Sequence, residues 1–185
     1  MGTRQNMRLY LVKHLFRAAM APSIAYFAYA LLAFCTAYYL WPEIGNPGVN
    51  ASYYGLSAAQ AAEVEATDTS YSQLLEAGTL AYGLGYAAWL GVSAGFYSVA
   101  AALCLVVMKN RLAAFVFPSA IYLAQSVLAI ALIGPQAGLV YSVHPFGLTQ
   151  LPIWIAAAPQ LLFIFSVIAG AGYVLSNIYR KGYLT

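Results

Sequence analysis

The sequence predicts an all-α integral membrane protein: a four-helix bundle with a short N-terminal interfacial helix and a small helical cap on the outer side. The first reason is composition. Hydrophobic residues make up 63% of the 185 residues and charged residues only 7%, whereas about a quarter of the residues of a soluble domain are charged. The second is that the apolar residues form four runs, each long enough to cross a hydrocarbon core of about 30 Å as a helix.

The basic N-terminal segment, residues 1–17, precedes the first apolar run. Its cations alternate with Leu, Val and Phe, a pattern typical of a helix that lies at the membrane surface among lipid headgroups. The first span is predicted over 18–41. This run is longer than the apolar part of a cleavable signal peptide, which has about 7–15 residues, so we expect a retained span.

The segment 42–78 separates the first two spans and contains all five acidic residues. Pro and Gly residues at its start indicate a turn-rich exit from the bilayer. Ser57-Ala58-Ala59-Gln60 then matches the Ser-x-x-Gln pattern of a helix capping box. We therefore expect this outer acidic segment to form the helical cap. Its acidic residues are Glu43, Glu63, Glu65, Asp68 and Glu76.

Three further apolar runs complete the predicted bundle. A short basic hairpin separates the first two of them, and an outer loop, 134–151, separates the last two. The whole chain is therefore predicted to form a single membrane domain, 1–185. The predicted second, third and fourth spans cover 79–108, 112–133 and 152–178.

The distribution of charge predicts the orientation. All eight Lys and Arg residues lie in the N-terminal segment, in the hairpin 109–111 or at 180–181, and the acidic residues all lie between the first two spans. By the positive-inside rule, we expect a multi-pass protein of the plasma membrane, which in bacteria is the cell inner membrane, with both termini in the cytoplasm. An even number of spans agrees with this orientation.

Several function classes are disfavoured by what the sequence lacks. The second, third and fourth spans contain no Asp, Glu, Lys, Arg or His, and such groups are the usual mark of proton relays and ion-coupled transport. We expect no catalytic residue, metal or cofactor, because no phosphate-binding loop, Cys-x-x-Cys pair or Ser/His/Asp set is present. We expect no nucleic-acid partner, because the formal net charge is only +3. His144 has no neighbouring ligands in the sequence and is expected to be an exposed loop residue.

Small residues recur at intervals of four within two of the predicted spans. This spacing lets two helix backbones approach closely in a membrane, where lipid supplies no hydrophobic drive for association. It predicts a helix-packing face, either within this chain or against another subunit. The residues are Ala87, Gly91 and Gly95, and in a weaker instance Ser166 and Gly170.

Gln125 and Gln160 are amide side chains inside the third and fourth spans. An amide without hydrogen bonds is costly in hydrocarbon. Each is therefore expected either to bond within the bundle or to line the path of a transported molecule.

Several features follow one another in order from residue 86 onward. A long span rich in small residues leads to a basic hairpin, an apolar run, an outer Pro-Phe pair and a final span closed by two cations. In this order and spacing the chain resembles the C-terminal half of an ABC-2-type transporter permease. The residues are Lys109-Asn110-Arg111, Phe117-Pro118-Ser119 with Tyr122 and Ser126, Pro145-Phe146 and Arg180-Lys181.

The resemblance implies a membrane subunit of a multi-component transporter, energised by a separate ATP-binding cassette ATPase and moving a peptide, a lipid or another amphiphile. It implies contact with this cytoplasmic partner through Arg8, Lys13, Lys109 and Arg111. Such permeases usually have six spans, whereas four are predicted here, which suggests either an accessory subunit or a divergent, shortened permease. The alternative hypothesis is a non-catalytic structural or assembly subunit of a larger membrane complex, in contact with lipid and other membrane subunits.

Overall fold

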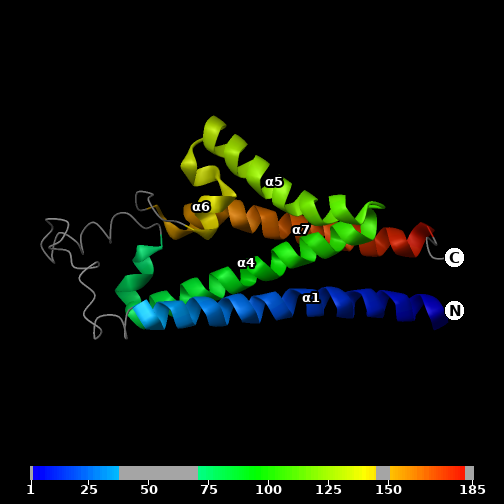
Figure 1. Ribbon diagram of the computed structural model, residues 1–185, viewed down its shortest axis with the longest axis horizontal. Helices are drawn as coiled ribbons and strands as arrows, with labels where there is room; N and C mark the ends of the chain where they lie inside the picture. The colour runs from blue at the N-terminus through cyan, green and yellow to red at the C-terminus, as the bar shows by residue number, and fades with distance from the viewer. Residues whose placement is uncertain (1, 38–70, 145–150, 182–185) are drawn as a thin grey trace, which may run out of the picture.

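The computed structural model describes residues 2–37, 71–144 and 151–181, and all regular structure within these ranges is helical (Figure 1). Most of the predicted cap, residues 42–70, lies outside the described residues. The long helices are α1 (Gly2–Cys35), α4 (Thr79–Val107), α5 (Arg111–Leu132) and α7 (Ile153–Lys181). The short helices are η4 (Ser72–Ala77), η5 (Pro135–Ala137) and α6 (Leu139–Val143).

The four long helices are each long and apolar enough to cross a membrane. The shortest, α5, has 22 residues, which corresponds to about 33 Å at a rise of 1.5 Å per residue. Their outer faces carry large apolar side chains in the open, among them Leu112, 80% exposed, and Leu132, 81% exposed, which is unusual for a soluble protein. The apolar stretches are Leu9–Cys35, Leu80–Val107, Arg111–Leu132 and Ile153–Asn177.

Helix α1 runs without a break from Gly2 to Cys35, about 51 Å. The sequence analysis predicted a separate surface helix over 1–17 and a span over 18–41, and the structure joins the two. The reason is local, because residues 3–21 contain no Gly or Pro and Pro22 lies inside the helix without ending it. A hydrocarbon core takes about 20 helical residues, so α1, with 34 residues, is longer than one crossing needs.

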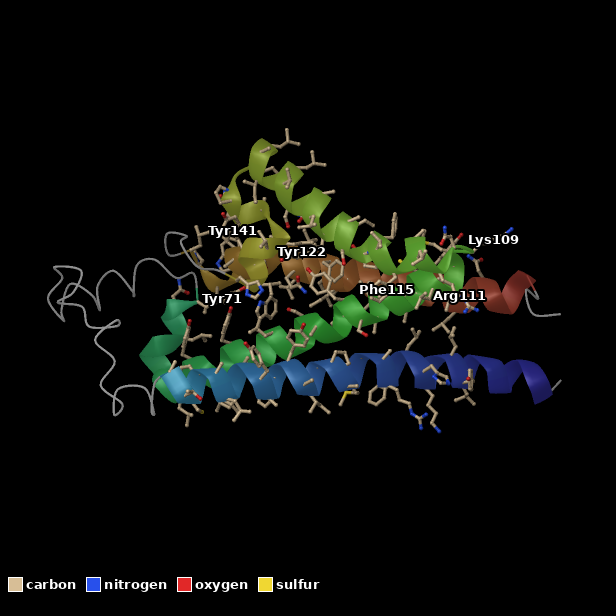
Figure 2. The ribbon with its side chains drawn as sticks, in the orientation of Figure 1. Tyr71, Lys109, Arg111, Phe115, Tyr122 and Tyr141 are labelled. Carbon is tan, nitrogen blue, oxygen red and sulfur yellow. The ribbon has the colours of Figure 1, made fainter. Side chains whose placement is uncertain are left out.

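A tight hairpin joins α4 to α5. Met108 is extended, with φ −92° and ψ 132°, and ends α4. The Asn110 side chain then caps α5, because its Oδ1 accepts hydrogen bonds from the backbone N–H groups of Leu112 at 3.0 Å and Ala113 at 3.3 Å. This hairpin carries Lys109 and Arg111 to the end of the molecule where both chain termini lie (Figures 1 and 2).

After α5 the chain folds back along that helix before α7 begins. Gly134 makes the reversal with φ +127°, a conformation that only glycine adopts readily. Helices η5 and α6 follow and contact both α5 and α7. The predicted outer loop 134–151 therefore contains ordered helical turns within residues 134–144.

Helix α4 is the centre of the arrangement, in contact with α1, α5 and α7. It lies side by side with α1 over most of its length, whereas α5 diverges from the other helices toward the α6 end (Figure 1). The buried apolar residues on these helices are mainly small, so the helices approach closely. They include Ala87, Ala114, Ala156, Ala157 and Val167.

Candidate functional site

The small-residue face of α4 lies against α1. Ala87 is 1% exposed. A Cβ added at Gly91 would lie 2.7 Å from the backbone oxygen of Ser23 and 3.0 Å from Cβ of Phe27, and one added at Gly95 would overlap the Ser23 hydroxyl. Glycine is thus required for the close approach of these helices. Of the two alternatives that the sequence left open, this geometry corresponds to packing within the chain.

The second predicted face, on α7, makes no such contact with the described residues. A Cβ added at Gly170 would meet nothing within 4 Å, and the Ser166 hydroxyl donates to Leu162 O of its own helix at 2.8 Å. Both residues border a cavity of about 730 Å³ between α4, α5 and α7, whose walls are mostly apolar. Ser166 and Gly170 therefore differ from the α4 face, where the helices are in direct contact.

Gln125 holds the beginning of α6 against α5. Its Nε2 donates to Ala137 O at 3.0 Å, and its Oε1 accepts from the Leu139 N–H at 3.0 Å. The neighbouring Ser126 hydroxyl accepts from the Val140 N–H at 3.2 Å. These side chains satisfy backbone groups that a short helix leaves without partners. Gln125 thus bonds within the bundle, and it also borders the cavity between α4, α5 and α7.

Three aromatic side chains hold the other end of α6. Tyr71 Oη and Trp89 Nε1 each donate to Ser142 O at 2.9 Å, and Tyr86 Oη donates to Val143 O at 3.1 Å. The last carbonyls of a helix lack intrahelical partners, so these donors replace water. Burial raises the pKa of Tyr71 to about 12. Helix α6 is therefore fixed at both ends by side chains that come from other elements.

A polar seam, which we define as Trp89, Ser93 and Tyr97, runs along α4 at intervals of four residues. Tyr97 Oη donates to Gln160 Oε1 at 3.2 Å, and Gln160, on α7, is fully buried. Gln160 therefore bonds within the bundle through one of its two polar atoms. Its Nε2 and the hydroxyls of Ser93 and Ser142 are buried without a hydrogen-bond partner, a situation that native proteins rarely leave unresolved.

A cavity of about 630 Å³ opens beside this seam, between α1, α4 and α5. We call it the tyrosine cavity. Tyr122 projects from α5 toward α4, where its ring meets that of Tyr97 edge-on at 5.4 Å between centroids (Figure 2). Ser93, Ser119 and His144 also border the cavity, although the Ser93 hydroxyl itself is buried. The Tyr and Phe residues that line the tyrosine cavity are Tyr26, Tyr29, Tyr97, Phe115 and Tyr122.

The predicted partner-contact residues lie apart from this cavity. Lys109 and Arg111 lie toward the end of the molecule at which α1 begins and α7 ends (Figures 1 and 2). Lys13 lies on α1, in its N-terminal half. The side chain of Arg8 lies outside the described residues.

Sequence reasoning did not single out Ser93 and Tyr97. A signal for them does exist, because Trp89, Ser93 and Tyr97 place a polar atom at every fourth position of an otherwise apolar run. Such a row lies on one helix face and needs partners when the helix is packed. His144 is exposed, as expected, but its place at the end of the cavity depends on the fold of α6.

Among the described residues, no group of three His, Cys, Asp or Glu side chains could hold a metal ion. Comparison of the chain with known protein families, with characterised proteins and with solved structures gave no match.

Proposed function

We propose that the chain is the membrane subunit of a multi-component transporter, permease-like and energised by a separate ATPase. In this proposal the four long helices cross the plasma membrane as a bundle, with the termini and the basic hairpin in the cytoplasm and the acidic segment 42–78 as an outer cap. The observation that carries it is the tyrosine cavity, about 630 Å³ of space lined by aromatic rings and hydroxyls. This volume is in the usual range for small-molecule sites.

The position of the cavity suits a translocated molecule. Ser93 lies at the middle of α4 and Tyr122 near the middle of α5, so in a spanning bundle both hydroxyls would lie near the centre of the bilayer. Substrate sites of membrane transporters are commonly found at that depth. No described residue that lines the cavity is Asp, Glu, Lys or Arg. Such a surface suits an amphiphile, whether a lipid, a peptide or a related molecule.

Energy for transport would have to come from a partner. The second, third and fourth spans have no ionisable Asp, Glu, Lys, Arg or His through which a proton or ion gradient is usually coupled. The hairpin cations, the beginning of α1 and the end of α7 lie toward the same end of the molecule (Figures 1 and 2). By the positive-inside rule that end faces the cytoplasm, where an ATPase would bind.

Site-specific photo-crosslinking in native membranes tests this function. A benzoylphenylalanine probe replaces Lys109 at the hairpin end or, as the matched control, Gln136, which is exposed at the opposite end. We expect the probe at 109 to capture a nucleotide-binding ATPase and the probe at 136 to capture none. Capture at 109 of membrane subunits alone, from a complex without ATPase activity, would contradict the proposal and favour a structural or assembly subunit.

A further inference from the structure

Four basic or hydrogen-bonding side chains lie on one face of α1 in its N-terminal half. They follow one another at intervals of three, four and seven residues, which places them on the same side of a helix. The rings of Tyr10 and His14 are in edge contact, at 4.1 Å between centroids. All four side chains are exposed. We call them the basic face, which consists of Tyr10, Lys13, His14 and Arg17.

The basic face is turned away from α4. The contact of α1 with the glycines of α4 is made by Ala19, Ser23 and Phe27. Counted at 3.6 residues per turn, Ala19 lies on nearly the opposite side of the helix from Arg17. Helix α1 also lies at the edge of the bundle, with α4 along one side (Figure 1). In a membrane the basic face is therefore turned toward lipid.

The same contacts determine the depth of the basic face. A Cβ added at Gly95 would lie 3.1 Å from the backbone oxygen of Ala19, and α1 runs antiparallel to α4 (Figure 1). Lys13 and Arg17 are therefore level with the C-terminal part of α4, before the hairpin begins. They also lie inside Leu9–Cys35, the stretch of α1 that is long and apolar enough to cross a membrane.

Cations at this depth need an anion close by. A charged side chain among acyl chains is costly, and a long Lys or Arg side chain lowers the cost by reaching toward the headgroups. The acidic residues of the chain all lie between positions 43 and 76, and Glu76 belongs to η4, which precedes α4 at the other end of that helix. The phosphate of a lipid headgroup is then the anion within reach.

A hollow beside Lys13 adds an apolar surface to the basic face. Its lining includes Leu9, Val12 and Phe16, and the Leu9 and Phe16 side chains are 69% and 64% exposed. Hydrocarbon placed against these side chains is favourable, so an acyl chain joined to the headgroup gains contacts there. A soluble phosphate compound would gain none.

We infer that the basic face binds an anionic phospholipid of the leaflet at the hairpin end. Lys13 and Arg17, one helical turn apart, donate charge-assisted hydrogen bonds to its phosphate, and an acyl chain lies in the hollow. A zwitterionic lipid has the same phosphate, but its choline cation would be repelled by the two side chains. The inference goes beyond the proposed function. It assigns Lys13 to lipid, where the resemblance implied contact with an ATPase.

Native mass spectrometry of the purified full chain resolves the binding of a single lipid and tests the inference. The probes are dioleoyl phosphatidylglycerol, which is anionic, and dioleoyl phosphatidylcholine, which has the same acyl chains and no net charge. We expect the first phosphatidylglycerol to bind at least about fivefold more tightly than the first phosphatidylcholine, the effect of one cation at a membrane surface. Lys13→Gln combined with Arg17→Gln should remove this preference.

A matched control distinguishes a site from a general attraction by charge. Lys109→Gln combined with Arg111→Gln removes the same two charges at the hairpin, where both side chains are also exposed, and should retain the preference. Equal affinity of the wild type for the two lipids, or an equal loss of preference in the two double variants, would overturn the inference. Because the purified chain contains no ATPase, the result is independent of the crosslinking experiment, and either proposal can fail while the other stands.

Discussion

Gly91 is the residue at which the packing of α1 on α4 is most sensitive to substitution. Its added Cβ would meet the backbone oxygen of Ser23 at 2.7 Å, and a backbone atom cannot turn aside as a side chain can. We expect Gly91→Ala to lower the melting temperature of the protein in detergent, with an overpacking cost of about 1–3 kcal/mol. Gly91→Leu should prevent the close approach of the two helices altogether.

Gly170 supplies the control for this prediction. A Cβ there meets nothing within 4 Å, so Gly170→Ala should leave the melting temperature unchanged or raise it, since Ala is the better helix former by about 1 kcal/mol. Equal melting temperatures for the wild type and Gly91→Ala would show that α1 and α4 are not in this contact.

The buried hydroxyl of Tyr71 should make the stability of the protein depend on pH in the alkaline range. Burial raises its pKa from 10.0 to about 12, so the folded state holds this proton more tightly than the unfolded state. Its contribution to stability is complete below about pH 10 and is lost as the pH rises toward 12. Between about pH 9 and pH 11 the melting temperature of the wild type should therefore fall further than that of Tyr71→Phe. Parallel falls in the two proteins would contradict the burial of Tyr71.

At the scale of elements, the hydrogen bonds that hold α6 predict how readily this helix unfolds locally. Gln125→Leu removes both amide bonds to the chain around α6, at about 1–3 kcal/mol for each backbone group left unpaired. We expect faster hydrogen exchange at the Leu139 amide, measured by mass spectrometry. The control is Gln136→Leu, which removes only one long bond of 3.5 Å at an exposed site. Unchanged exchange in Gln125→Leu would mean that α6 is held by other contacts.

The long helices could be predicted from the sequence, whereas α6 could not. Run length and hydropathy predicted spans over 79–108, 112–133 and 152–178, each close to the observed helix, because the length needed to cross a bilayer is a local property of the chain. The short helix α6 depends on partners between 14 and 71 residues away. The polar seam needed the same long-range information, because its role depends on which helix lies opposite.

In the N-terminal helix, a change in charge along the sequence did not correspond to a helix boundary. The change from basic to apolar residues near position 18 predicted a boundary between two helices, yet the backbone has no residue there that ends one. Composition changes along α1 while its backbone conformation does not. The small-residue face illustrates the converse, since the spacing predicted close packing and the fold alone identified α1 as the partner.

For the whole molecule, the central claim is four crossings with the termini and the hairpin on one side. The structure brings the chain ends and Lys109 and Arg111 to the same end and the α5–α6 turn to the other (Figures 1 and 2). Such an arrangement requires an even number of crossings. Two sites at the opposite ends of the helices are therefore sufficient to test it, and Ser57, outside the described residues, supplies a third.

Labelling of single cysteines with a membrane-impermeant maleimide tests this claim most directly, in a chain whose Cys35 and Cys104 are replaced by Ser. The account predicts that Ser57→Cys and Gln136→Cys react in intact cells, whereas Lys109→Cys reacts only after the membrane is opened. Reaction of Lys109→Cys from outside, with the other two protected, would reverse the orientation. Reaction of position 109 together with either outer position in intact cells would contradict the four-span arrangement itself.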